Sequence, residues 1–222
     1  MEKKMTTKRV VSCSDCGLQS CYRRDKKFPP FCLSHSGDTA QLDEVVELYR
    51  GDGEDGHISR AAAEVEGTYY GKLTRVEEII AFANRIDAKR IGIATCVGLI
   101  EETRVFAKIL RAHGLDSFAV LCKVGSIDKT EAGIPEELKI AKGCHESLCN
   151  PIYQAKRLNA EKTDLNVIVG LCVGHDSLFI KYSEALVTTL VTKDRVLAHN
   201  PAAALYTSGF YYKRLLAPSG KL

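Results

Sequence analysis

The hydrophobic pattern changes along the chain at about residue 71. Beyond that point, short apolar runs alternate with longer segments whose apolar residues recur every three or four positions. The runs are typical of buried β-strands, and the longer segments are typical of amphipathic helices. The pattern predicts four strands, over residues 90–95, 117–121, 166–171 and 187–191.

Helix signals separate the predicted strands. Thr74 and Glu77 have the spacing of a capping box, and Asn150-Pro151 and Asn200-Pro201 each place a capping residue before a proline at the first helical position. The predicted helices cover residues 74–86, 99–113, 135–142, 151–158, 177–185 and 201–206. Strands joined by helices of this length form right-handed βαβ units. We therefore expect an α/β fold, a Rossmann-like parallel sheet of about four strands with helices on both faces.

The first 71 residues follow no such alternation. Residues 1–36 are rich in cysteine and basic side chains and have no regular apolar period, so they cannot build a hydrophobic core and need a metal to fold. Residues 37–71 contain two predicted helices, about 40–50 and 58–70. We expect three parts: a Cys-rich metal-binding knuckle over 1–36, a helical linker over 37–71 and the α/β domain over 72–222.

The basic charge is concentrated at the start of the chain. The net charge of all 222 residues is +3, whereas residues 1–36 carry eight Lys or Arg and three Asp or Glu side chains, a net charge of +5. Thiolates that bind a divalent metal would offset part of that charge. We therefore interpret the basic residues as charge compensation around a metal, and we expect no nucleic-acid partner.

The apolar segments of the sequence indicate the location of the protein, and the location in turn indicates what its cysteines do. The first ten residues lack the apolar stretch of a signal peptide, and the longest apolar runs, 91–100 and 167–174, are too short to span a bilayer. We expect a cytoplasmic protein with no membrane partner. In a reducing compartment, nine cysteines indicate metal binding or catalysis rather than disulfides.

The first cysteine cluster has the spacing of a metal knuckle. Cys13 and Cys16 stand three apart and are followed by Gly17, which lets the chain curl back toward a metal, and Cys21 and Cys32 complete a set of four. We expect a tetrahedral zinc-type site on these four thiolates. His35, three residues after Cys32, could replace one sulfur. An iron–sulfur cluster and thiols without metal are the alternatives.

A second set of thiols lies at the ends of the predicted strands. Cys96, Cys122 and Cys172 each end a strand shortly before a glycine. Because ligands of open α/β sheets bind outside the carboxyl ends of the strands, these sulfurs could converge there. Cys144 and Cys149 come from one loop, directly before a predicted helix.

These residues predict a second metal or an iron–sulfur cluster at that edge of the sheet. Our preferred ligands are Cys96, Cys144, Cys149 and Cys172, because Cys96 and Cys172 share the sequence Cys-Val-Gly. Cys122 and His175 are further candidates. Redox or nucleophilic thiols and inert core cysteines are the alternatives. The charged residues after the last strand, including Lys193 and Arg195, are interpreted as a solvated strand end rather than as an anion site.

Several of these motifs also carry a family resemblance. The chain resembles an uncharacterised prokaryotic family of predicted metal-binding proteins, a domain of unknown function. The resemblance implies metal binding through the cysteines and supplies no reaction. It rests on Cys13-Ser-Asp-Cys16-Gly17, Cys144-His145 with Cys149-Asn150-Pro151, residues 169–176 and residues 193–201.

The sequence supports two functions of different classes. The first is a two-site metalloprotein, with zinc in the knuckle and a second metal or iron–sulfur cluster at the sheet edge for redox or small-molecule chemistry. The second is a zinc-stabilised regulatory module that binds a small molecule at the strand ends without catalysis. The residues name no substrate, reaction or oligomeric state.

Overall fold

The structure, a computed structural model, describes residues 10–217 except 24, 26, 37 and 38. The chain divides into two compact units, residues 1–60 and 61–222. The helices of the first unit are α1 (Ser20–Arg23), α2 (Leu33–Ser36), α3 (Thr39–Arg50) and the start of α4 (Glu54–Tyr69), and Cys13–Asp15 forms a 3-10 turn. Among the residues of this unit whose burial is described, a set without Ser36, the buried ones are Ser20 and Gly56 and the others are at least partly exposed. The first unit therefore has no apolar core in the part that the structure describes.

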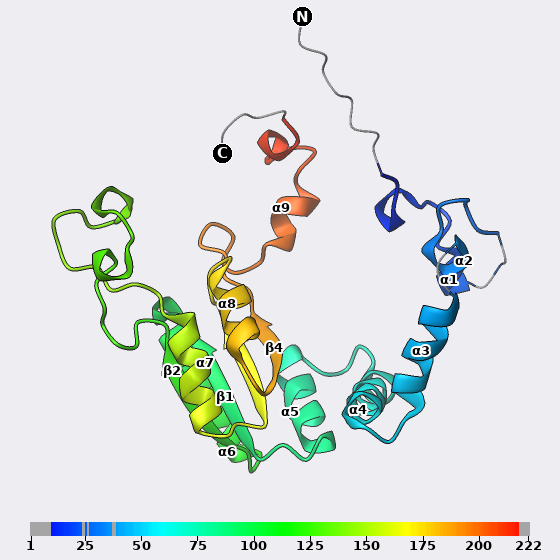
Figure 1. The fold of residues 1–222 in the computed structure, drawn as a ribbon, viewed down its shortest axis with the longest axis horizontal. Helices are drawn as coiled ribbons and strands as arrows, with labels where there is room; N and C mark the ends of the chain where they lie inside the picture. Colours follow the sequence, from blue (N-terminus) through cyan, green and yellow to red (C-terminus); the bar gives the residue numbers. More distant parts are fainter. Residues whose placement is uncertain (1–9, 24, 26, 37–38, 218–222) are drawn as a thin grey trace, which may run out of the picture. The chain divides into compact units, whose positions relative to one another are not determined.

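The second unit contains a parallel sheet of four strands in the order β2-β1-β3-β4 (Figure 1). The strands are β1 (Arg90–Thr95), β2 (Asp116–Leu121), β3 (Leu165–Val169) and β4 (Leu186–Val191). The chain starts in the middle of the sheet at β1 and adds β2 on one side, and it then returns to add β3 and β4 on the other side. The strand order therefore reverses between β1 and β3. This arrangement confirms the predicted α/β fold.

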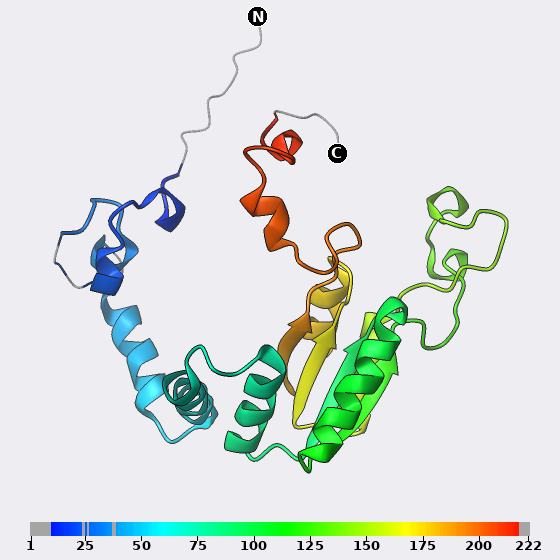
Figure 2. The same cartoon turned by 180° about the vertical axis from the view of Figure 1, so that it is seen from behind.

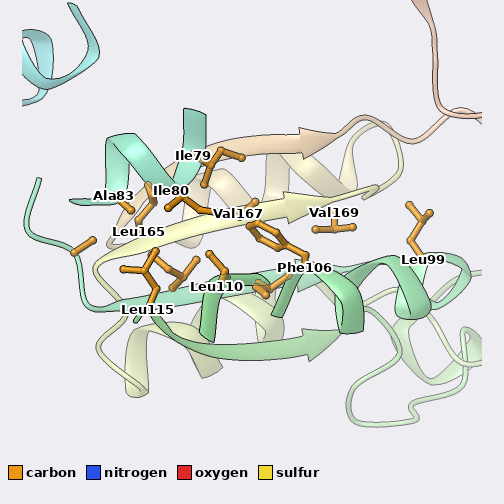
Figure 3. Close-up of a cluster of buried hydrophobic side chains, with 13 residues drawn as sticks. Ile79, Ile80, Ala83, Leu99, Phe106, Leu110, Leu115, Leu165, Val167 and Val169 are labelled. Atoms are coloured by element: carbon orange, nitrogen blue, oxygen red, sulfur yellow. The ribbon is translucent and has the colours of Figure 1, made fainter. Parts of the chain in front are cut away.

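Helices cover both faces of this sheet (Figures 1 and 2). α5 (Arg75–Arg85) and α6 (Ile100–Ala112) pack on one face, and α7 (Pro151–Ala160) and α8 (His175–Tyr182) pack on the other. Figure 3 shows the α5/α6 side, where Phe106 and Leu110 meet Val167. The remaining short elements are α9 (Ala202–Tyr206) and 3-10 turns at Val97–Leu99, Thr130–Ala132, Glu136–Leu138 and Lys213–Leu216. No helix in the described part of the chain is long and apolar enough to cross a membrane.

Alternation along β1 decides which side chains reach which layer. Ile91 and Ile93 belong to the core under α5 and α6, whereas Ala94 and then Cys96 belong to the core under α7 and α8. Successive side chains of a strand point to opposite faces, so residues 92, 94 and 96 share the α7/α8 side. Val120 and Cys122 share that side on β2 for the same reason.

Gly92 is required by a buried polar contact on the α7/α8 side. Asn166 of β3 is fully buried, and its amide bonds both the Thr163 and Ser183 hydroxyls, each at 2.7 Å. A Cβ added at Gly92 would lie 2.0 Å from Asn166 Oδ1 and 2.9 Å from Leu158 Cδ1. Because both hydrogen bonds hold the Asn166 amide in place, it cannot move aside at low cost.

A long excursion over residues 122–150 connects β2 to α7 at the carboxyl end of the sheet (Figure 1). The helix predicted over 135–142 is wrong, since only Glu136–Leu138 is helical, as a 3-10 turn. Glu146 explains the difference, because its carboxylate accepts the N–H groups of Ile140 and Ala141 at 2.7 and 2.9 Å. Side chains thus satisfy backbone donors that a longer helix would have paired internally.

Asp128 holds the excursion together. Its carboxylate accepts the N–H groups of Thr130 and Glu146 at 2.9 and 2.8 Å and forms an ion pair with the buried Lys139 ammonium at 2.8 Å. Lys139 also bonds Glu136 at 2.8 Å and the Cys144 carbonyl at 3.1 Å. The Lys139 ammonium, followed by the bonds from Thr130, holds the pKa of Asp128 well below its usual range.

Replacing Gly92 by alanine should destabilise the second unit. We expect Gly92→Ala to lower the free energy of unfolding by about 1–3 kcal/mol, since the methyl group overpacks the sheet against Asn166. Urea titration measures the change. Gly67→Ala is the matched control, because Gly67 is exposed on α4 with nothing near the added methyl, and there the change should stabilise by about 1 kcal/mol. Equal effects at both positions would contradict the account.

The Asp128 network should make the excursion sensitive to acid. Since the folded-state pKa of Asp128 lies below its ordinary value of 3.8, its stabilisation is complete well above pH 3.8 and is lost as the pH falls through the lowered value. At neutral pH, Asp128→Asn should raise hydrogen exchange at the Thr130 and Glu146 amides and leave that of β1 unchanged. Asp116→Asn, on an exposed carboxylate, is the control. Unchanged exchange in residues 125–149 of Asp128→Asn would refute this role.

Candidate functional site

Two cysteines lie side by side at the ends of neighbouring strands. Cys96 directly follows β1 and Cys122 directly follows β2, and the Cys122 N–H donates to the Thr95 carbonyl at 2.8 Å. Both side chains are buried on the α7/α8 side, with 6% and 2% of their surface exposed. The register of β1 and β2 therefore places their sulfurs at one level of the same face.

Asn150 brings a third cysteine to the same place. Its N–H donates to the Cys122 carbonyl at 2.7 Å and its side-chain amide donates to the Val124 carbonyl at 3.3 Å, while its side-chain oxygen caps α7 at the Tyr153 N–H. Cys149, which precedes Asn150, packs against the buried cluster that contains Cys96 and Cys122. The capping residue that the sequence indicates thus also fixes the position of a thiol.

The three thiols pack in one cluster, where each changes the pKa of its neighbour. Cys122 bonds both Cys96 and Cys149, and these bonds lower the pKa of each of the two flanking thiols to about 5. Its bonds to Cys149 and Cys96, followed by its burial, raise the pKa of Cys122, which keeps its proton. The Val97 N–H also donates to the Cys122 sulfur, at 3.3 Å. The group therefore offers two thiolates on either side of one thiol.

Basic side chains stand at both thiolates. Lys123 donates to the Cys149 sulfur at 3.4 Å and to the Ser147 carbonyl at 2.6 Å. The charge of Lys193 helps to lower the pKa of Cys96, and that of His175 helps to lower the pKa of Cys149. Lys123 was not among the residues that the sequence singled out, although its place next to Cys122 is a signal that could have identified it.

Gln154 of α7 ties the two strand ends together. It is fully buried, and its Nε2 donates to the Val120 carbonyl at 2.7 Å and to the Thr95 carbonyl at 3.2 Å. These acceptors lie on β2 and β1, within two residues of Cys122 and Cys96. Gln154 therefore helps to hold the two thiols in register, a role that a polar residue inside a helix pattern does not reveal.

Cys172 does not join the three thiols. β3 ends at Val169 rather than at residue 171 as predicted, because Gly170 turns the chain with φ of 74° and leaves no room for a side chain beside Leu99. Cys172 lies further from its strand end than Cys96 does, is partly exposed, and accepts a bond from Arg195 at 2.8 Å. The structural counterpart of Cys96 is thus Cys122, and not Cys172 as the shared Cys-Val-Gly sequence suggested.

Cys144 is also apart from the group. Its side chain is exposed within the excursion, where its carbonyl accepts the Lys139 ammonium. His175 begins α8 and is partly buried. Of the preferred set Cys96, Cys144, Cys149 and Cys172, the structure brings Cys96 and Cys149 together and adds Cys122.

In the first unit, the four predicted ligands line one cavity. The cavity has a volume of about 250 Å³, and Cys13, Cys16, Cys21 and Cys32 all contribute to its wall. Apolar walls come from Pro29, Phe31 and Leu33. His35 is not part of this lining, and its ring stacks on Phe28 with centroids 5.4 Å apart.

Neither place has the spacing of a bound metal. In the described residues, no group of three or more His, Cys, Asp or Glu side chains is arranged closely enough to hold an ion. The chemistry of the donor sets nevertheless fits soft metals, since both consist of thiols. The structure thus gathers suitable donors without closing them into a coordination shell.

Comparison with known proteins gives a family and no activity. The uncharacterized protein MJ0455 of Methanocaldococcus jannaschii is 46% identical over 207 residues, which cover 93% of this chain and 98% of that protein. No solved structure matches. The family model described as "Protein of unknown function (DUF1847)" matches residues 32–190. The chain therefore belongs to the DUF1847 family, whose function is unassigned.

Proposed function

We propose that this chain is a metal-binding protein with two cysteine sites. The first is a structural, zinc-type site on Cys13, Cys16, Cys21 and Cys32. The second holds another metal or an iron–sulfur cluster at the sheet edge. The observation that carries the proposal is the buried cluster in which Cys96, Cys122 and Cys149, from three separate segments, pack together.

The absence of a core supports the first site. A segment whose described residues bury almost nothing gains little from hydrophobic packing, so a cross-link must hold its fold. Four thiols around one small cavity are suitable donors for a tetrahedral metal. Metal binding in such segments is coupled to folding, so the sulfurs would close around the ion as it binds.

The protonation pattern supports the second site. Thiolates are the ligand form of cysteine, and Cys96 and Cys149 have lowered pKa values while burial limits their contact with water. Metal binding would release the proton of Cys122, since cysteine binds metals as the thiolate. Three sulfurs would then leave a tetrahedral centre one ligand short, which is how catalytic metals are usually held. The bound group would supply Lewis-acid or redox chemistry at this edge of the sheet, and Lys123 and Lys193 would balance its thiolate charge.

One observation favours a second candidate function. The Cys122 thiol is in direct hydrogen-bonding contact with Cys149, an arrangement that suits dithiol–disulfide chemistry. Oxidation by a disulfide of a thiol carrier would join Cys122 and Cys149 and reduce the carrier to two thiols. In that case the sheet edge would bind no metal.

Metal analysis of matched variants tests the proposal. The full chain is purified without oxygen, and zinc, iron and acid-labile sulfide are measured per chain. Cys16→Ser should lose the metal of the first site and keep that of the second, and Cys122→Ser should do the reverse. Cys144→Ser is the control and should lose neither, since Cys144 is exposed and apart from both groups.

The outcomes separate the two candidates. If Cys122→Ser keeps the full metal content of the wild type, the sheet-edge site is refuted. If in addition Cys122 and Cys149 become resistant to alkylation after mild oxidation and recover with a reductant, the redox function is favoured. A wild type without any metal would overturn both sites.

A further inference from the structure

A braced turn follows β4 and carries two cations. The Asp194 carboxylate accepts the N–H groups of Val196 and Leu197 at 2.9 and 2.8 Å. The Asp194 backbone is bonded on both sides to His199, with its carbonyl accepting the His199 N–H at 2.9 Å and its N–H donating to His199 Nδ1 at 3.2 Å. Ala198 and His199 adopt positive φ values of 49° and 63° to close the turn. Lys193 and Arg195 flank Asp194 and are therefore held by a defined backbone.

The two cations reach the point where the strand order reverses. Arg195 donates to the sulfur of Cys172, which follows β3, at 2.8 Å. The Lys193 Nζ lies 3.2 Å from the place where a Cβ on Gly98 would be, two residues after Cys96 at the end of β1. Its charge also helps to lower the pKa of Cys96. The turn that follows β4 thus places two positively charged side chains at the ends of β3 and β1. Small ligands of open α/β sheets bind at this reversal point.

The surface around the cations is open. Val97 and Val173 are 48% and 90% exposed, and a side chain on Gly174 would touch nothing within 4 Å. Two carboxylates close in sequence to these groups bond backbone N–H groups instead of the cations. Asp194, between Lys193 and Arg195, bonds its own turn, and Asp176, four residues after Cys172, accepts the Ser177 N–H at 2.8 Å. The Arg195 guanidinium donates one hydrogen bond to the Cys172 sulfur, whereas a guanidinium can bind an oxyanion through two parallel hydrogen bonds.

We propose that Lys193 and Arg195 bind the phosphate or carboxylate group of a small-molecule ligand, beside the Cys96–Cys122–Cys149 group. The inference deepens the proposed function, since it supplies the class of ligand for the same sheet edge and rests on that site being functional. The oxyanion would take the place of Cys172 on the Arg195 guanidinium. Lys193 would then bridge the oxyanion and the thiol group, and so position the ligand against whatever the thiols hold.

Calorimetric titration with two probes tests the inference. The full chain is titrated with inorganic phosphate and, separately, with acetate, in a buffer free of both, and the metal and sulfide content of every sample is recorded. The wild type should show saturable binding of at least one probe. Lys193→Gln and Arg195→Gln should each weaken it about tenfold or more, the value of one charge-assisted hydrogen bond.

The control variants remove one positive charge at positions outside the proposed anion site. Lys181→Gln on α8 and Arg104→Gln on α6 remove exposed cations and should bind as the wild type does. Binding of phosphate alone or of acetate alone supports the inference and identifies the group. No saturable binding of either probe overturns it, as does unchanged affinity in both site variants.

A second measurement on the wild type does not depend on how the variants fold. Phenylglyoxal modifies accessible arginines, and peptide mapping reports the rate at each position. The probe that binds should slow modification of Arg195 and leave Arg104 unchanged, and equal rates with and without it would overturn the inference. Because metal content is measured in the same samples, anion binding without sheet-edge metal would refute the metal site alone, and metal without anion binding would refute this inference alone.

Discussion

The parallel register of β1 and β2 is the constraint on which the sheet-edge site depends. The Thr95 carbonyl accepts the Cys122 N–H, and Gln154 of α7, on the same side of the sheet as the thiols, donates to a carbonyl of each strand. Because side chains alternate along a strand, a shift of one residue would turn a sulfur to the α5/α6 side. On the other side of β1, the close packing of Gly92 against Asn166 fixes the register between β1 and β3.

The fold could be predicted largely from the sequence, because apolar runs and capping residues define its elements locally. β1 spans the predicted residues, and Asn150 caps α7 as expected. The extent of the helix over 135–142 could not be predicted correctly, because the N–H groups of Ile140 and Ala141 donate to Glu146, which comes later in the chain. The thiol group was predicted in part, because the register that pairs Cys96 with Cys122 and the turn at Gly170 that removes Cys172 are both long-range properties.

Charge links the thiols to the segments that surround them. Lys123 belongs to the excursion and donates to the Cys149 sulfur. Lys193 and Arg195 belong to the turn after β4, where Arg195 donates to the Cys172 sulfur and the charge of Lys193 lowers the pKa of Cys96. The sequence alone suggested a solvated strand end for the latter pair. The structure instead places Arg195 on the Cys172 sulfur and Lys193 beside Gly98, at the ends of β3 and β1.

X-ray absorption at the metal edge tests the central claim most directly. The sample is Cys16→Ser, in which the first site is removed and any bound metal reports on the sheet edge. The account predicts a shell of sulfur ligands at about 2.3 Å whose number falls when Cys122 is also changed to serine. A shell of oxygen and nitrogen alone, or a sulfur shell that Cys122→Ser leaves intact, would contradict it.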